Sequence, residues 1–282
     1  MPFAPVIPLG GLSGWRFLER TQERQQALFN NSSDLQREIN YFKQNIGAVT
    51  SSAELVADRR LLSVALGAFG LSEEINKQAF VRTVIDGGTF DPLSFANRLG
   101  NSNYLEFAKT FSFGNDGGFV PTTNRIDDIV DKFLNTQFEE AVGGVDNTMR
   151  LALNFKREIS ELAGQNLPRD TGWFRALGSL PIRAVLESAF NLPAEFSQIG
   201  LDQQKDVLIS KAKQFFGGDS INIFSDPEIL DDMVRRFHLR EQINNGPDAS
   251  TPGMAALSLL QSGNSFGGIG AAGILNLLLS NT

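Results

Sequence analysis

Residues 268–273 are the segment where the sequence most resembles a cofactor site. Gly268, Gly270 and Gly273 match the G-x-G-x-x-G string of dinucleotide-binding loops. Such a loop follows a strand, opens a helix and has an acidic residue about twenty positions later. Here the segment is rich in Gly and Ala, and the sequence ends at Thr282 without that acid. We interpret the match as a coincidence of composition and predict no cofactor.

His238 is the single histidine of the chain, so a metal site built from several histidines is excluded. It stands between Phe237 and Leu239, and it follows Arg235 and Arg236, whose charges would oppose a bound cation. The pattern predicts a structural histidine at the end of a helix. A role as general base is the alternative.

Paired acids occur at Asp127, Asp128 and Asp131, and again at Glu139 and Glu140. On a helix, residues 127 and 131 share a face and could hold a cation. Acids near the start of a helix more often interact with the helix dipole and with solvent. We therefore predict neither a metal site nor a catalytic residue.

Asp58, Arg59 and Arg60 form the charged triplet that most resembles a binding site. One interpretation is a solvated helix face on which an acid pairs with an arginine one turn away. The other is a docking point for an acidic group of a partner protein, which a planar guanidinium recognises well. The triplet is our candidate partner-binding site.

Composition excludes several functions. The chain of 282 residues has a net charge of −7, which argues against nucleic acid, because that ligand needs clustered Lys and Arg. It has no Cys, so disulfides and thiolate chemistry are excluded. Residues 269–279 form the longest apolar stretch and are too short to span a bilayer. No cation precedes Arg16, so we expect no cleavable secretory signal.

The elements that must position any site are helices, because apolar residues recur at spacings of three and four nearly everywhere. We predict an all-α, multi-helical protein of about twelve helices. Ser33 with Gln36, and Ser51 with Glu54, form capping-box patterns at helix starts. The second box opens a helix whose apolar stripe extends to Phe69.

One apolar phrase occurs twice, at residues 64–71 and at residues 185–192. The shared positions of the first copy return 121 residues later in the second. They are Val64, Ala68, Phe69 and Leu71, which return as Val185, Ala189, Phe190 and Leu192. The repetition predicts two divergent copies of a unit of short helices.

Four segments follow from the helix pattern. They are an extended arm over 1–12, a first helical unit over 13–114, a second, divergent unit over 119–246 and a Gly-, Ala- and Leu-rich tail over 247–282. Both ends of the chain are apolar. They either pack against the body or act as assembly arms that order against a partner.

Residues 58–71 resemble the core signature of a bacterial family catalogued as domain of unknown function 1217. The stretch Ser94-Phe95-Ala96-Asn97-Arg98-Leu99 and residues 108–114 fit the same pattern, and residues 14–18 are similar to the N-termini of the family. The resemblance covers roughly residues 10–115. It implies a protein associated with the flagellum, because members tend to be encoded among flagellar genes, and it implies no catalytic residues.

Three hypotheses follow. The first is a non-enzymatic structural or interaction protein of the flagellum, for which self-association is an open question. The second is a cytosolic chaperone or regulator of flagellar export or assembly, which would shield an apolar helix in a groove. The third is an enzyme that uses acids such as Asp58 or Asp127. The location stays open between the cytoplasm and the flagellum.

Overall fold

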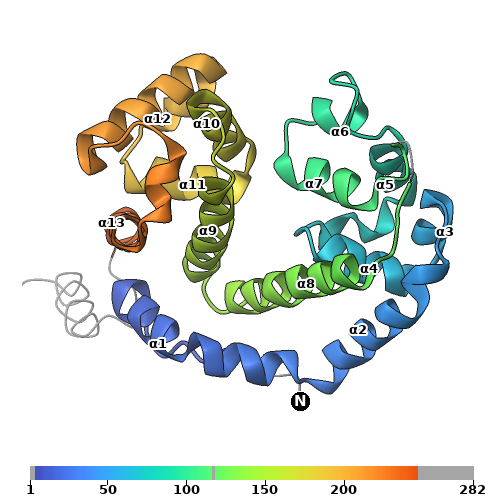
Figure 1. Cartoon of the computed structure of the whole chain (residues 1–282). Coiled ribbons are helices and arrows are strands. Elements are labelled where there is room, and N and C mark those ends of the chain that lie inside the picture. The colour runs from blue at the N-terminus through green and yellow to red at the C-terminus, as the bar shows by residue number, and fades with distance from the viewer. Residues whose placement is uncertain (1–3, 116–117, 247–282) are drawn as a thin grey trace, which may run out of the picture.

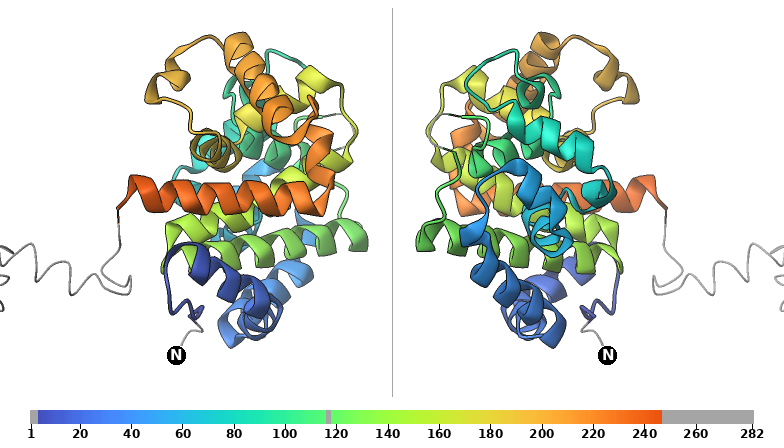
Figure 2. Two further views of the ribbon diagram at one scale, coloured as in Figure 1. Left: turned by 90° about the vertical axis from the view of Figure 1, so that its left-hand side faces the viewer. Right: turned by 90° about the vertical axis from the view of Figure 1, so that its right-hand side faces the viewer.

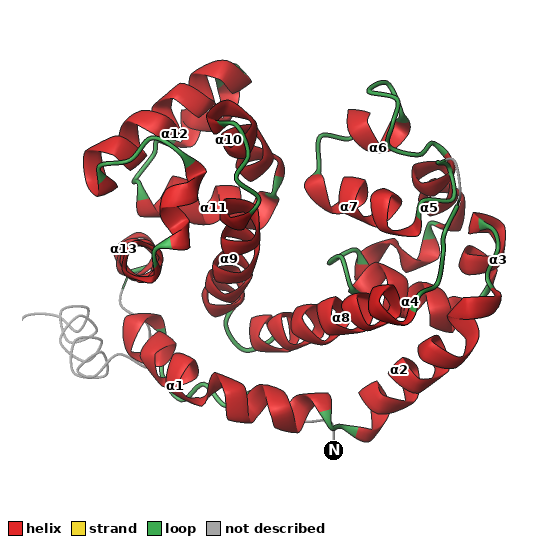
Figure 3. Ribbon diagram, in the orientation of Figure 1, coloured by secondary structure: helices red, strands yellow, loops and turns green. Residues whose placement is uncertain are grey.

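The computed structural model describes residues 4–115 and 118–246. Within these ranges the chain forms thirteen α-helices, four short 3-10 helices and no strand, which confirms the predicted all-α class (Figure 3). The predicted tail over 247–282 lies outside the described residues. The α-helices are α1 (Gly11–Asn30), α2 (Ser33–Asn45), α3 (Ser52–Ala57), α4 (Arg59–Gly67), α5 (Gln78–Asp86), α6 (Phe95–Arg98), α7 (Ser102–Phe111), α8 (Thr123–Gly143), α9 (Asn147–Gly164), α10 (Arg169–Gly178), α11 (Leu180–Ala189), α12 (Leu201–Phe216) and α13 (Pro227–Asn244), and the 3-10 helices are η1 (Ile46–Ala48), η2 (Ser72–Asn76), η3 (Ala194–Gln198) and η4 (Ile221–Ser225).

The helices form two arms that are joined at a common base (Figure 1). In Figure 1, α3 to α7 make one arm, α9 to α13 make the other, and α8 runs along the base between them. The side view in Figure 2 shows α13 extended along its arm with the first turns of α1 below it, and these two helices are in contact. We call the arms the first arm and the second arm.

Each arm has its own hydrophobic core, and α8 contributes to both. Ile129 and Phe133 of α8 belong to the core of the first arm, whereas Phe138 and Val142 belong to the core of the second. Helix α1 also packs into the second core, although it precedes the first arm in the sequence; Trp15 is one of its buried residues there. The division at residues 114–118 and the two-copy origin of the arms stay predictions.

Local capping residues set most helix starts. The side chain of Thr122 accepts a hydrogen bond from the backbone N–H of Arg125. The side chain of Asp146 accepts hydrogen bonds from the backbone N–H groups of Thr148 and Met149. These bonds satisfy N–H groups that have no partner inside the helix. Ser51 accepts from the backbone of Glu54, which confirms that cap.

Two details of the sequence interpretation are wrong. Helix α2 begins at Ser33, but no side-chain cap forms there, and Gln36 donates instead to the carbonyl of Asn30. The helix predicted to run from Ser51 to Phe69 is broken at Asp58 into α3 and α4. The carboxylate of Asp58 accepts bonds from backbone N–H groups of α4, so it competes with the continuous helix and starts a new one.

The N-terminal arm packs against the body over its described residues. Pro5 is buried, and the side chain of Gln25 forms hydrogen bonds with both the N–H and the carbonyl group of Val6. The N–H of Val6 donates to Oε1 of Gln25 at 2.7 Å, and Nε2 of Gln25 donates to the carbonyl of Val6 at 3.1 Å.

Within the described part of the chain, no helix is both long and apolar enough to cross a bilayer.

Candidate functional site

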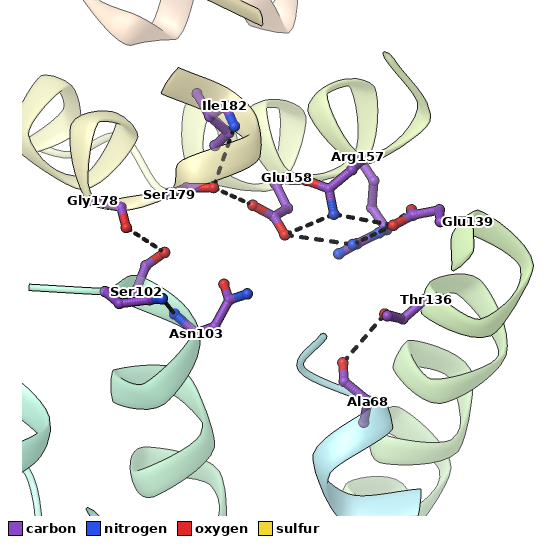
Figure 4. Close-up of polar contacts among 12 residues, drawn as sticks. Ala68, Ser102, Asn103, Thr136, Glu139, Arg157, Glu158, Gly178, Ser179 and Ile182 are labelled. Atoms are coloured by element: carbon purple, nitrogen blue, oxygen red, sulfur yellow. Dashed lines mark hydrogen bonds and ion pairs between the residues drawn. The ribbon is translucent and has the colours of Figure 1, made fainter. Parts of the chain in front are cut away.

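A cleft of about 200 Å³ lies between the two arms. The C-terminal end of α4 and the N-terminus of α7 form its wall on the first arm, and α9, α10 and the start of α11 form the opposite wall (Figure 4). Ser102 Oγ donates to the carbonyl of Gly178 at 3.5 Å, which is a direct contact between the arms. The polar and charged side chains of the lining are Ser102, Asn103, Glu106, Lys132, Thr136, Asn154, Arg157, Glu158, Glu161, Gln165, Arg175 and Ser179.

Arg157, which is partly buried, and Glu139, which is buried, form an ion pair beside the cleft. Nε and Nη2 of Arg157 donate to the two carboxylate oxygens of Glu139 at 2.7 and 2.9 Å, which is a bidentate arrangement. Burial alone would lower the pKa of Arg157, but the hydrogen bonds and charge of Glu139 raise it above its ordinary value. Arg157 therefore stays cationic, and each charge of the pair already has a partner.

Glu158 is the acid of the cleft with the greatest chemical interest. Burial raises the pKa of its carboxyl group, although the charge of Arg157 and a hydrogen bond from Ser179 act against this. Ser179 Oγ donates to Oε2 at 2.7 Å, and Asn154 Nδ2 donates to Oε1 at 3.1 Å. A carboxyl group with a raised pKa in a cleft is typical of general acids. Both of its oxygens are hydrogen-bonded here, so the geometry equally suits a structural role.

A second feature lies on the first arm, in the loop between α5 and α6. Phe90 and Leu93 are its two most exposed apolar side chains, with 77% and 76% of their surface accessible. The loop backbone is held in place by Asn97, whose Nδ2 donates to the carbonyls of Thr89 and Asp91 at 3.1 and 2.8 Å. We call residues 89–93 the apolar loop.

Two further contacts fix the apolar loop. Oδ1 of Asn115 accepts from the backbone N–H of Thr89 at 2.9 Å. Gly88 has a φ of 61°, and a Cβ atom there would lie 2.6 Å from the carbonyl oxygen of Gly114. Only glycine fits this close approach of two backbones. The loop is thus a rigid support for two exposed apolar side chains.

A groove of about 590 Å³ runs beside the apolar loop. Its lining includes residues of α7, the start of α8 and Arg175 of α10. Arg175 also lines the cleft, so the groove and the cleft adjoin. We call this feature the loop groove, and the side chains used below are Phe90, Leu105, Glu106, Lys109, Val120, Arg125 and Arg175.

The predicted triplet lies away from both features, at the start of α4. Asp58 caps this helix and accepts a hydrogen bond from the hydroxyl of Tyr41 at 2.7 Å. Burial opposes ionisation of Asp58, but these bonds outweigh it and hold the pKa of the carboxyl group below its ordinary value. Arg60 lies over the ring of Tyr41, and Arg59 donates to Asn76. Partner binding at the triplet stays a prediction.

The other candidates are dispersed. Asp127 pairs with Lys43 at 2.6 Å, and no group of three His, Asp or Glu side chains able to hold a metal occurs in the described ranges. Residues 268–273 lie outside the described residues. His238 is fully buried inside α13 rather than at its end, with its ring 5.1 Å from that of Trp15. Burial lowers the pKa of His238 to about 4.

Sequence reasoning identified Glu139 only as one of two neighbouring acids, and it missed both the ion pair of Glu139 with Arg157 and the apolar loop. Glu139 follows Phe138 on the apolar face of a helix, and a charge on such a face indicates a buried pair, although its partner Arg157 is on the next helix. The apolar loop also left a signal. Phe90 and Leu93 stand in a short segment between Gly88 and Ser94 that contains Pro92, where two large apolar residues are unusual.

Three comparisons with known proteins bear on this arrangement. A family model described as "Protein of unknown function (DUF1217)" matches residues 68–230. No curated protein matches the chain. An X-ray crystal structure of an Agrobacterium tumefaciens protein, determined by a structural genomics consortium, is similar with a TM-score of 0.69 and 24% sequence identity. The match covers 87% of this chain and 98% of that one, and it shows the fold.

Proposed function

The chain belongs to the DUF1217 family of proteins of unknown function, and from this premise we propose that it is a non-enzymatic protein that binds a protein partner through the apolar loop. Phe90 and Leu93 carry the proposal, because they are exposed on a backbone that Asn97 and Asn115 hold in place. A large apolar side chain on a rigid support loses little entropy on binding, so more of the free energy of its burial remains as affinity.

The charged side chains of the cleft support the same proposal. Arg157 is engaged by Glu139, and Glu158 is engaged by Ser179 and Asn154. A buried pair of this kind holds helices in a defined arrangement when every member has a partner. In the proposed function these contacts therefore hold α8, α9 and α11 in place, and the apolar loop makes the contact with the partner.

Association with the flagellum is part of the proposal, and its support is the family resemblance of the sequence. Two versions differ in where the protein acts. As a structural component it would co-purify with the basal body or filament, whereas as a chaperone or regulator of export it would stay in the soluble fraction. Fractionation of cells that carry the tagged protein distinguishes them.

The test of partner binding is capture from native cells with three versions of the tagged chain. We expect flagellar or motor proteins to be retained by the wild type and lost with the Phe90→Ala, Leu93→Ala double variant. Leu180→Ala with Ile243→Ala is the matched control, because these side chains are also exposed, at 66% and 69%, but lie on the second arm. Identical retained proteins for all three versions would contradict the proposal.

A further inference from the structure

The loop groove has an excess of positive charge in an acidic protein. Its described lining contains three cations, Lys109, Arg125 and Arg175, and one acid, Glu106. Since the whole chain has a net charge of −7, the cations at this groove are a local concentration against the general charge.

Two of these cations have no carboxylate partner within ion-pair distance in the described chain. Arg125 donates to the carbonyl of Val120 at 3.4 Å, and Arg175 donates to Oε1 of Gln165 at 2.9 Å; both acceptors are neutral. Lys109 is the exception, because its Nζ lies 3.8 Å from Glu106. As far as the described residues go, Arg125 and Arg175 have no acidic partner and can pair with acids of another molecule.

Apolar surface lies between the cations. Phe90 forms one rim of the groove, and Val120, which is also exposed, lies close to Arg125. Leu105 of α7 adds a partly buried apolar side chain to the lining. Apolar side chains set among unpaired arginines complement a ligand that alternates apolar and acidic groups.

We propose that the loop groove binds an acidic amphipathic helix of a protein partner, with apolar residues against Phe90, Leu105 and Val120 and carboxylates paired with Arg125 and Arg175. This inference rests on the proposed function and names the chemistry of the partner. A helix is favoured over an added strand, because the described residues offer no sheet edge to extend. A nucleic acid is disfavoured, because the cations are few and the chain is acidic.

Binding of this helix has a structural consequence. Arg125 belongs to α8 and Phe90 to the first arm, whereas Arg175 belongs to α10 of the second arm. A bound helix that pairs with both arginines would therefore contact both arms. Exchange of the backbone amides around Ser102 and Gly178 should slow when the helix is bound, because the hydrogen bond between these two residues joins the same arms.

The experiment measures fluorescence anisotropy of a labelled peptide with the purified full chain. The probe is a synthetic helix of about 18 residues with Leu on one face and Glu on the other. The comparison peptide carries Lys in place of every Glu. We expect the Glu peptide to bind and the Lys peptide not to bind. Binding of the Glu peptide should weaken as salt rises from about 50 to about 500 mM.

The variants test the named contacts. Arg125→Glu with Arg175→Glu should weaken binding of the Glu peptide by about tenfold or more, and Phe90→Ala should weaken it by about tenfold. Arg16→Glu with Arg20→Glu is the matched control, because it reverses two exposed cations of α1 that are far from the groove in the chain. It should leave binding unchanged. Arg125→Gln with Arg175→Gln replaces the double reversal if that variant fails to fold.

Three results would overturn the inference: no binding of the Glu peptide, equal binding of both peptides, or equal losses in the groove variants and the α1 control. If any of these occurs while capture of partners still depends on Phe90 and Leu93, the partner chemistry is wrong and the proposed function stands. If that capture fails as well, both are wrong.

Discussion

The cores of the two arms differ in the polar groups that they bury. The polar side chains that are buried around the core of the first arm are small; they are Ser52 and Ser94. Amide, carboxylate and imidazole groups are buried around the second core and at its boundary with α8. These are Gln25, Glu139, Asn154, Gln204 and His238. The first arm therefore depends mainly on apolar packing, whereas the second also depends on hydrogen bonds and on protonation.

The repeated phrase shows how alike the arms are at close range. Gly70 and Asn191 both adopt left-handed backbone conformations, with φ of 66° and 53°. The N–H of Leu71 bonds to the carbonyl of Leu66 at 3.0 Å, and Leu192 bonds to Glu187 in the same way at 2.9 Å. Both helices thus end in the same kind of C-terminal cap. The phrase specifies a helix end, and the surroundings of each copy decide what that end contacts.

The largest expected loss of stability in either core comes from truncating the phenylalanine in each copy of the repeated phrase. Phe190 is 2% exposed and stacks on Phe215, whereas Phe69 is 8% exposed and lines the cleft. We expect Phe190→Ala to lower the free energy of unfolding by roughly 3–5 kcal/mol, and Phe69→Ala to lie at the low end of that range because water can enter from the cleft. Urea unfolding measures both. A cost below about 1 kcal/mol for either would show that its phrase is not core.

The difference in buried polar groups predicts a difference in response to acid. The pKa of His238 is about 4 in the fold and about 6.5 when exposed, so the unfolded chain binds the proton more strongly. Stability is complete above pH 6.5 and falls as the pH drops towards 4. For this group alone the loss between pH 7.5 and pH 5 is about 2 kcal/mol. His238→Leu should remove that loss, as measured by urea unfolding at both pH values.

Hydrogen exchange at pH 5 locates the acid effect. Helices α1 and α13, which enclose His238 and Trp15, should lose protection before α4 and α5 of the first arm. Equal loss in both arms would show that His238 does not set the acid response. The same outcome would weaken the contrast between an apolar first core and a partly polar second core.

The N-caps of α4 in the first arm and α11 in the second arm allow a comparison with smaller expected effects on stability. Asp58 accepts from the backbone of Arg60 and of Leu61 and from the hydroxyl of Tyr41, whereas Ser179 accepts from Ile182 at 3.5 Å and donates to Glu158. We expect Asp58→Ala to cost about 1–2 kcal/mol and Ser179→Ala about 1 kcal/mol. Thermal unfolding gives both values. Asp58→Asn, which keeps an acceptor, is the control and should cost less than Asp58→Ala.

The smallest expected effects concern the left-handed residues. Gly70→Ala places a Cβ at 3.5 Å from Asn103, which is an ordinary contact, so its cost of about 1 kcal/mol comes from backbone strain alone. Asn191→Gly should change stability by less than about 0.5 kcal/mol, because asparagine tolerates this conformation. Thermal unfolding of both variants checks this. A larger loss from Asn191→Gly would show that its side chain has a specific role.

The capping signal at Ser51 predicted a helix start correctly, whereas the same kind of signal at Ser33 did not give a side-chain cap. Thr122, Asp146 and Asp226, which are residue types common at N-caps, also cap their helices, and Gly217 ends α12 in a left-handed conformation. The break at Asp58 was missed, because its flanking residues continue the apolar spacing of three and four. A side chain that competes for backbone N–H groups can end a helix without any change in that spacing.

The candidate site was less predictable, because its members are far apart in the sequence. The triplet that begins at Asp58 could be selected from the sequence because its three charged residues are consecutive. The groove instead combines Phe90 and Arg125 with Arg175, which come from three different elements. Single residues of ordinary type, spread over almost ninety positions, leave no pattern that a window of sequence can detect.

The sequence by itself determined the all-α class, most helix ends and the apolar face of each helix, because capping and the 3.6-residue period act over a few residues. Tertiary structure alone decided that α1 joins the second core, that α8 serves both cores, and that Arg157 meets Glu139. It also decided that Phe90 and Leu93 are the most exposed of the large apolar side chains in the described residues. These outcomes depend on contacts between distant segments, which form only when whole helices pack together.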